Sequence, residues 1–152
     1  MDYEHLTVER DGPVTVVRLA RPERANALSR ALMGELIRCA EAFHEDLETR
    51  AVVFAGEGRH FCAGADLSEP RNAGATRLAA RRGNRLGRDL VRAVRGIEAI
   101  TVAALEGAAL GGGACIATAC DFRVAGADAY AGYPEIDLGM NLQWGALPLC
   151  VQ

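Results

Sequence analysis

Two short stretches of small residues stand where a chain can expose its backbone amides to a ligand. They are "FCAGADL", residues 61–67, and "EGAALGGG", residues 106–113. Each follows an apolar run typical of a buried strand and precedes a segment with helical character. Gly and Ala let a ligand oxygen approach the main chain, which larger side chains would prevent. Two fixed amides that converge on one oxygen form an oxyanion hole, which stabilises negative charge as it develops in a reaction.

The glycine triplet 111–113 begins a helix of very small residues. The start of such a helix presents unpaired N–H groups and the positive end of the helix dipole, so it favours an anion or an oxyanion. No Gly-Lys-Ser/Thr follows, which argues against a phosphate loop, and the spacing is not the G-x-G-x-x-G of dinucleotide-binding folds. A glycine triplet taken alone is more often a sign of close packing between a helix and a sheet.

Histidine and cysteine residues do not form a recognisable metal site. The three histidines, His5, His44 and His60, have no metal-ligand spacing, and His60 is expected in a turn or at the surface. The five cysteines are an odd number without a C-x-x-C pair. We therefore expect no metal, and a reduced, cytoplasmic compartment rather than a disulfide framework.

The strands expected to carry these turns are short apolar runs. Residues 6–21 predict two strands around the turn pair Asp11-Gly12, and residues 50–58 predict a strand covered on both faces. Residues 101–105 predict a further buried strand, and residues 122–139 an extended or strand-rich stretch.

Two amphipathic helices are expected between the strands. One begins after the N-cap Ser29, with an inward stripe at Leu32, Leu36, Ala40, Phe43 and Leu47. The other spans residues 76–97 and is rich in Arg, with an inward stripe at Leu78, Leu86, Leu90, Val94 and Ile97. Strands that alternate with helices predict an α/β fold with a largely parallel sheet.

The overall composition narrows the class of protein. The chain has 152 residues, half of them apolar, which suits one domain over residues 1–152 with a real core. The formal charge of −3 and the scarcity of aromatic residues argue against nucleic-acid binding. The N-terminus lacks a signal-peptide pattern, and Glu106 with several glycines interrupts the longest apolar stretch, so no membrane span is expected.

Four motifs together resemble the crotonase superfamily of enoyl-CoA hydratases and isomerases. They are "RPERANALS", "FCAGADL", "EGAALGGG" and "YPEIDLGM", in that family's order and approximate spacing along essentially the whole chain. The resemblance implies the α/β ClpP/crotonase fold, a spiral of repeated ββα units with a mostly parallel sheet. It also implies an acyl-CoA substrate whose thioester enolate is held by two backbone amides, those of Ala65 and Gly112.

The same resemblance assigns the proton-transfer groups. Family hydratases use two glutamates, and Glu135 matches one of them, whereas Cys115 stands at the position of the other. A buried neutral thiol is a poor acid or base, since its reference pKa of ~8.5 rises in apolar surroundings. One carboxylate suffices to move a proton between carbons, as in family Δ3,Δ2-enoyl-CoA isomerases. We therefore favour isomerase-like chemistry, with Glu135 as the base that moves the proton. The alternative interpretation of Glu135 is a surface acid in a Pro-containing turn, with no part in the reaction.

Two alternatives stay open. The alternatives to isomerase-like chemistry are a hydratase with weak activity and a noncatalytic acyl-CoA-binding or assembly fragment. The second is suggested by the apolar character of the sequence up to Gln152, where we expect family members to continue into C-terminal helices.

The resemblance also implies the substrate-binding residues and partners. Arg24 and Ala25 match the segment that contacts CoA, with Arg24 a candidate phosphate partner. Gln143 and Trp144 are expected to wall the acyl pocket, where Trp144 would shape chain-length preference. Further substrate-binding candidates are Ala63, Asp66, Leu67, Gly111 and Cys115, although Asp66 and also Asp121 have the pattern of structural caps. CoA is part of the substrate, so no separate cofactor is expected, and a complete chain is expected to form a homotrimer or homohexamer.

Overall fold

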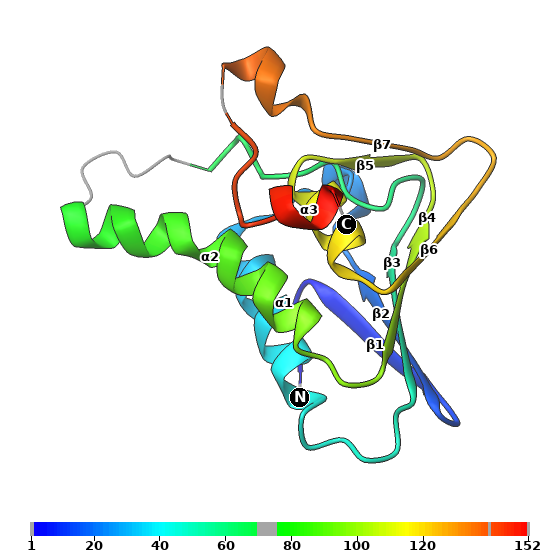
Figure 1. Ribbon diagram of the computed structural model, residues 1–152. Helices are drawn as coiled ribbons and strands as arrows, with labels where there is room; N and C mark the ends of the chain where they lie inside the picture. The colour runs from blue at the N-terminus through cyan, green and yellow to red at the C-terminus, as the bar shows by residue number, and fades with distance from the viewer. Residues whose placement is uncertain (1, 70–75, 140, 152) are drawn as a thin grey trace.

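The computed structural model describes residues 2–69, 76–139 and 141–151 (Figure 1). Its main sheet has the strand order β1-β2-β3-β4-β6. The first pair is an antiparallel hairpin, and the following pairs are parallel, as the alternation of strands and helices predicts. The strands span Leu6–Asp11 (β1), Val14–Leu19 (β2), Ala51–Gly56 (β3), Ile100–Leu105 (β4) and Phe122–Ala125 (β6).

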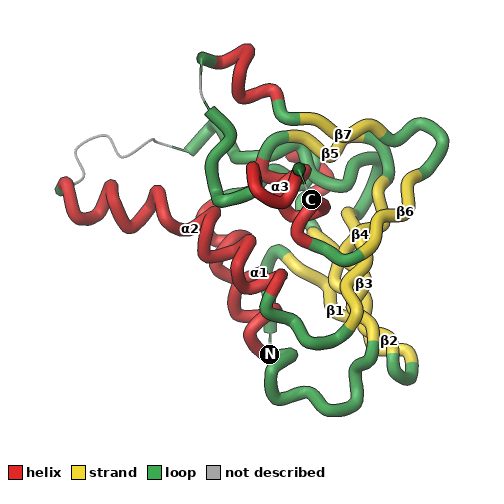
Figure 2. The backbone as a smooth tube through the Cα atoms, viewed as in Figure 1, coloured by secondary structure: helices red, strands yellow, loops and turns green. Residues whose placement is uncertain are grey.

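Helices lie on one side of this sheet, where α1 and α2 run side by side (Figure 2). The α1 helix begins at the expected cap, because the hydroxyl of Ser29 accepts a hydrogen bond from Leu32 N at 3.1 Å. The α2 helix also has a hydroxyl cap, since that of Thr76 accepts a hydrogen bond from Ala79 N at 3.2 Å. The helical segments span Pro22–Arg24 (η1), Arg30–Ala42 (α1), Arg77–Arg95 (α2), Gly112–Ala119 (α3), Pro134–Leu138 (η2) and Leu147–Cys150 (α4).

A second, smaller layer crosses the end of the main sheet, where β5 (Ala108–Leu110) pairs in parallel with β7 (Tyr130–Gly132) (Figure 1). Isolated parallel bridges join Cys62 to Ala109 and Leu28 to Ala65. Successive turns of the chain thus each add one strand to the main sheet and one short segment to the second layer. This arrangement is the predicted spiral of ββα units.

The core fills the space between the main sheet and the helices. Phe54 of β3 is fully buried, as are Leu32 and Leu36 of α1 and Leu90 and Val94 of α2. These side chains lie on the apolar stripes that the sequence predicts, because burying one face of each helix removes the largest apolar area from water.

Several details differ from the sequence-based expectations. The stripe of the first helix was expected to include Leu47, but α1 ends at Ala42 and Leu47 is 94% exposed. Leu78 was expected to face inward, but it is 59% exposed because the first turns of α2 project beyond the body of the protein (Figure 1). The hairpin turn is Gly12-Pro13 rather than Asp11-Gly12, since Asp11 already pairs with Val14.

The central strands also differ from the expectation of burial on both faces. In β3, which was expected to be covered on both faces, and in β4, most buried residues alternate with half-buried or exposed ones, because the helices cover a single face of the sheet. Among the described residues, no helix is both long enough and apolar enough to cross a membrane. In the same part of the chain, no three His, Cys, Asp or Glu side chains gather in a way that suits a metal ion.

Candidate active site

The two small-residue turns lie against each other in the second layer. Cys62 N donates to Ala108 O at 2.9 Å, and Leu110 N donates to Cys62 O at the same distance. These bonds align the loop that follows β3 with the start of the glycine triplet. Residues that are far apart in sequence therefore form one site because the spiral stacks successive ββα units.

The N–H of Ala65 points away from Leu28, the residue with which Ala65 forms a parallel bridge. Leu28 N donates to Gly64 O at 2.8 Å, and Asp66 N donates to Leu28 O at 3.1 Å. In a parallel bridge of this kind, the residue between the two bonded ones turns its own N–H to the opposite side. The N–H of Gly64 is directed to the Cys62 sulfur at 3.4 Å, which leaves the Ala65 amide as the donor of this loop.

The Ala65 loop closely approaches the amide of Gly112 at the first position of α3. Gly64 has φ +97°, and a β-carbon there would lie 2.8 Å from Leu110 O and 3.6 Å from Gly112 N. Gly64 thus permits contact between the two backbones that a side chain would prevent. Within the described part of the chain, neither the Ala65 nor the Gly112 amide donates a hydrogen bond. Two segments that approach each other closely thus each have an amide without an acceptor among the described residues, which is one requirement of an oxyanion hole.

Glu135 of η2 lies beside these amides. A β-carbon at Gly111 would be 3.1 Å from the Glu135 Oε1 atom, so the carboxyl group rests against the residue before Gly112. The Glu135 Oε2 atom is buried and has no hydrogen-bond partner among the described residues. A buried carboxylate oxygen without a partner is costly, which distinguishes Glu135 from an acid on a surface turn.

The segment that carries Glu135 is tied to α3. Gly111 N donates to Gly132 O at 2.9 Å, and the Tyr133 hydroxyl is hydrogen-bonded to the hydroxyl of Thr118. Burial raises the pKa of Tyr133 above its ordinary value, so the phenol stays protonated. These bonds hold Glu135 at a fixed position relative to the Gly112 amide.

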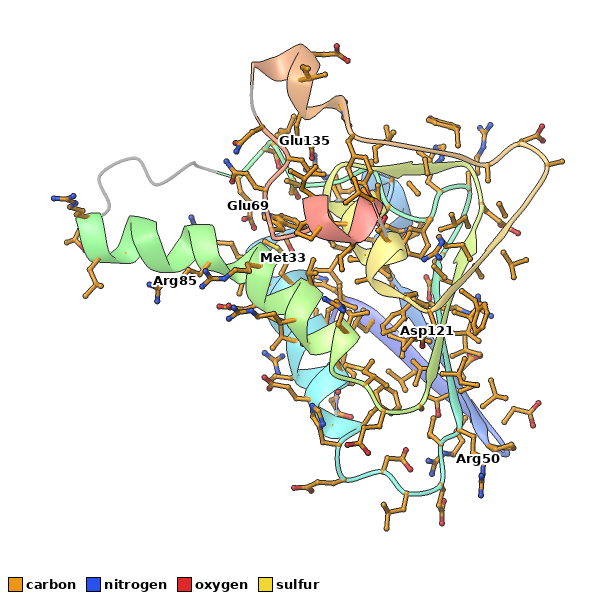
Figure 3. All side chains as sticks on the ribbon, viewed as in Figure 1. Met33, Arg50, Glu69, Arg85, Asp121 and Glu135 are labelled. Carbon is orange, nitrogen blue, oxygen red and sulfur yellow. The ribbon has the colours of Figure 1, made fainter. Side chains whose placement is uncertain are left out.

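A cavity of about 510 Å³ opens beside these groups. Figure 3 shows Glu135, Glu69 and Met33 along the side of the molecule where the cavity lies. Ten of the residues expected at the site line it: Ala63, Ala65, Asp66, Leu67, Gly111, Gly112, Cys115, Glu135, Gln143 and Trp144.

Cys115 faces this cavity from α3 but is poorly suited to proton transfer. Burial raises the pKa of its thiol to about 12, and the nearby Glu135 carboxylate raises that pKa as well. The thiol is therefore protonated and neutral near pH 7.

The acids Asp66 and Asp121 both have structural partners. Asp66 accepts hydrogen bonds from the Ser68 hydroxyl at 2.6 Å and from Arg21 at 3.1 Å, and the pKa of its carboxyl is lowered by these contacts, above all by Ser68. Asp121 accepts from Thr101 N and Oγ1 at 2.8 Å each and lies away from Glu135 (Figure 3). Both acids thus have the capping contacts expected of them.

Arg24 and Ala25 are the predicted site residues that the cavity lining does not include. Arg24 is exposed in η1, and Ala25 O accepts a hydrogen bond from Ala63 N at 2.9 Å. Their segment therefore lies against the Ala65 loop, outside the cavity, and the role of Arg24 in phosphate binding stays a prediction.

Sequence reasoning missed several residues that shape the site. Glu69 lines the cavity and caps α1 through Arg30 N, with 3.2 Å to each carboxylate oxygen. Asn26 is fully buried and donates to Glu57 O at 2.9 Å and His60 O at 2.8 Å. Gly87 of α2 contacts the indole of Trp144. An isolated Gly inside a helical pattern is the signal that could have identified Gly87.

The sequence of this chain matches a protein family and several known proteins. A family model described as enoyl-CoA hydratase/isomerase matches residues 9–151. A crotonyl-CoA hydratase from Syntrophomonas wolfei is 34% identical over 146 residues, which cover 95% of this chain and 55% of that protein. A short-chain-enoyl-CoA hydratase from Clostridium acetobutylicum is 35% identical over the same number of residues.

Solved structures are similar in fold as well as sequence. Pseudomonas aeruginosa AtuE superposes with a TM-score of 0.90 at 37% identity, over 97% of this chain and 57% of that one. An enoyl-CoA hydratase from Bacillus anthracis gives a TM-score of 0.86 at 35% identity, over 95% and 57% of the two chains. The chain thus spans about half the length of the curated relatives it matches.

Proposed function

We propose, from the premise that this chain belongs to the enoyl-CoA hydratase/isomerase family and has the crotonase fold, that it acts on acyl-CoA thioesters through an enolate. The finer proposal is that it moves the double bond of a 3-enoyl-CoA to the 2-position. No resident cofactor is required, because CoA is part of the substrate.

The proposed reaction needs one base and one oxyanion hole. The Glu135 carboxylate takes a proton from C2, and the electron pair of that C–H bond moves toward the thioester carbonyl. The resulting dienolate oxygen accepts hydrogen bonds from the Ala65 and Gly112 amides. Protonated Glu135 then returns the proton at C4, which leaves the double bond between C2 and C3.

One observation carries this proposal: Glu135 has a buried carboxylate oxygen in the cavity beside the Gly111–Gly112 backbone, and no described residue donates a hydrogen bond to it. The neighbouring carboxylates Asp66 and Glu69 are already bound to other groups. A carboxylate without a partner can accept a substrate proton without first breaking a structural contact.

Replacement of Glu135 by Gln tests the assignment. Glu135→Gln keeps the shape of the side chain but removes its basicity, so turnover of a 3-enoyl-CoA should fall by about 10²–10⁴-fold. The measurement is the rise in ultraviolet absorbance as the conjugated 2-enoyl thioester forms. Binding of a saturated acyl-CoA by the same variant, followed by calorimetry, should change little.

Asp137→Asn is the matched control, because Asp137 is an exposed acid on the same turn of η2. This variant should retain the turnover of the original chain. Equal turnover by Glu135→Gln and Asp137→Asn would refute the role of Glu135.

Hydration of a 2-enoyl-CoA is the second candidate function. The relatives named above are crotonyl-CoA and short-chain-enoyl-CoA hydratases, which favours it. Against it, Cys115 with a pKa of about 12 stands where the family's second carboxylate is expected, so hydration should be weak. Loss of the 2-enoyl absorbance in the same assay distinguishes hydration from double-bond migration.

The proposal for the whole protein also includes a cytoplasmic homotrimer or homohexamer. A noncatalytic acyl-CoA-binding or assembly role is the rival from another class. Saturable binding of acetyl-CoA without turnover of any enoyl-CoA would favour that rival.

A further inference from the structure

Trp144 is held between two glycines that belong to different helices. A β-carbon at Gly87 of α2 would overlap Cδ2, Cε2 and Nε1 of the indole. A β-carbon at Gly112 of α3 would overlap Cζ3 and Cη2 of the same ring. The five-membered side of the indole therefore contacts α2, and the six-membered side contacts the residue that supplies the oxyanion-hole amide.

The backbone at Trp144 is strained in a way that fits this placement. Its φ is +62°, in the left-handed region that a bulky residue rarely adopts. Strained backbone persists where the surrounding contacts over-determine it, and such positions cluster at ligand sites. The contacts with Gly87 and Gly112 provide that restraint on one side of the cavity.

The surroundings of the indole are apolar. The β-carbon built on Gly112 would also lie 2.9 Å from Leu28 Cδ1, and both Leu28 and Met33 line the cavity with Trp144. Leu28 and Met33 are buried. Leu28, Met33 and the indole thus form an apolar wall, which suits a hydrocarbon chain.

We propose that the stack of Gly87, Trp144 and Gly112 sets the acyl-chain selectivity of the site, with the indole closing the space into which a longer chain would extend. This inference rests on the proposed function, because it takes the ligand to be an acyl-CoA. A thioester whose oxygen is bound at the Gly112 amide places its first carbons beside the indole. Gly87 acts only through Trp144 and is a positioning residue.

The first test measures binding rather than turnover. Butanoyl-CoA and decanoyl-CoA are saturated and do not react, so calorimetry gives a dissociation constant for each with the original chain and with Trp144→Ala. We expect the affinity for decanoyl-CoA relative to butanoyl-CoA to rise by about tenfold or more in Trp144→Ala, since the vacated space admits further methylenes. Free CoA should bind both proteins equally.

Gly87→Ala provides a second test that leaves the tryptophan in place. The added methyl group occupies the position of the indole, so the relative affinity for decanoyl-CoA should change in the same direction. Trp144 is the single tryptophan of the chain, and its fluorescence emission should shift to the red as the ring moves away from its position between Gly87 and Gly112.

Gly34→Ala is the matched control for Gly87→Ala, because Gly34 is also a helix-interior glycine. A β-carbon at Gly34 would meet only Arg38 Nη1, at an ordinary 3.6 Å, among the described residues. This variant should change neither the emission nor the selectivity.

The outcomes separate this inference from the proposed function. Unchanged relative affinity in both Trp144→Ala and Gly87→Ala, with acyl-CoA still bound, would overturn the selectivity role alone. If no protein in the series binds any acyl-CoA, the proposed function falls and this inference falls with it.

Discussion

At the scale of single residues, the chemistry available depends on which cavity groups can exchange a proton near neutral pH. Burial and the Glu135 charge both disfavour the Cys115 thiolate, so Cys115 neither accepts nor readily donates a proton. Glu135 carries a buried carboxylate oxygen to which no described group donates a hydrogen bond. A site with one such group suits proton transfer between two carbons better than addition of water, which needs a second acid or base.

Cys115→Glu tests this argument by adding the second carboxylate. Hydration of a 2-enoyl-CoA should rise about tenfold or more over the original chain, because a second carboxylate supplies the missing acid–base group. The measurement is the loss of 2-enoyl absorbance, with the melting temperature recorded alongside to show that the variant is folded.

Cys115→Ala is the control, since it removes the thiol without adding an acid. It should leave hydration at the level of the original chain. A folded Cys115→Glu variant that hydrates no faster than Cys115→Ala would show that this position does not control the reaction type.

At the scale of elements, the site depends on how firmly each helix is packed. The α1 helix buries Leu32, Leu36 and Ala40 and carries cavity residue Met33, whereas the first turns of α2 project into solvent (Figure 1). The N-cap of α1 is itself buried, because Ser29 is 5% exposed. Loss of order at the start of α1 would therefore disturb the core and one wall of the cavity together.

Ser29→Ala should lower the free energy of unfolding by about 1 kcal/mol, because it removes the acceptor for Leu32 N. Urea unfolding followed by far-ultraviolet circular dichroism measures this loss. Thr76→Ala removes the equivalent cap of α2 but should cost clearly less, since the first turn of α2 is exposed and frays with little loss of packing. Equal losses in the two variants would contradict this difference between the helices.

At the scale of the whole molecule, the main sheet ends in an apolar edge. Strand β6 is the outer strand next to β4, and Phe122 and Val124 on it are 59% and 64% exposed. An exposed apolar edge strand is a template for pairing with another chain. Arg123 lies between them, and its guanidinium donates to Ala117 O and Cys120 O. The opposite edge, β1, carries the charged residues Glu9 and Arg10.

We expect copies of this chain to associate with one another through β6. Sedimentation velocity should show a concentration-dependent increase in mass, and Phe122→Lys should reduce it because a charge blocks edge pairing. Val8→Lys on β1 is the control and should leave association unchanged. A monomer at every concentration, or equal effects of both variants, would exclude this edge as the contact.

Much of the architecture could be predicted because its signals are local. The cap at Ser29, the apolar runs of β3 and β4 and the small-residue start of α3 depend on neighbouring residues, and the structure contains each of them. The expectation for Leu47 is wrong because apolar periodicity does not show where a helix ends, and α1 ends at Ala42. The expectation for Leu78 is wrong because periodicity shows which face a residue occupies but not whether another element covers that face.

The sequence by itself determined the order of strands and helices, the two turns with exposed amides and the presence of Glu135 without a second matching glutamate. Only the tertiary structure decided that Gly64, next to Ala65, approaches the Gly112 amide, that Glu135 Oε2 is buried with no hydrogen-bond partner among the described residues and that Gly87 accommodates Trp144. The physical reason is the distance along the sequence over which each kind of interaction acts. Capping and periodicity act within a few residues, whereas these contacts arise when separate ββα units stack and exclude water from the space between them.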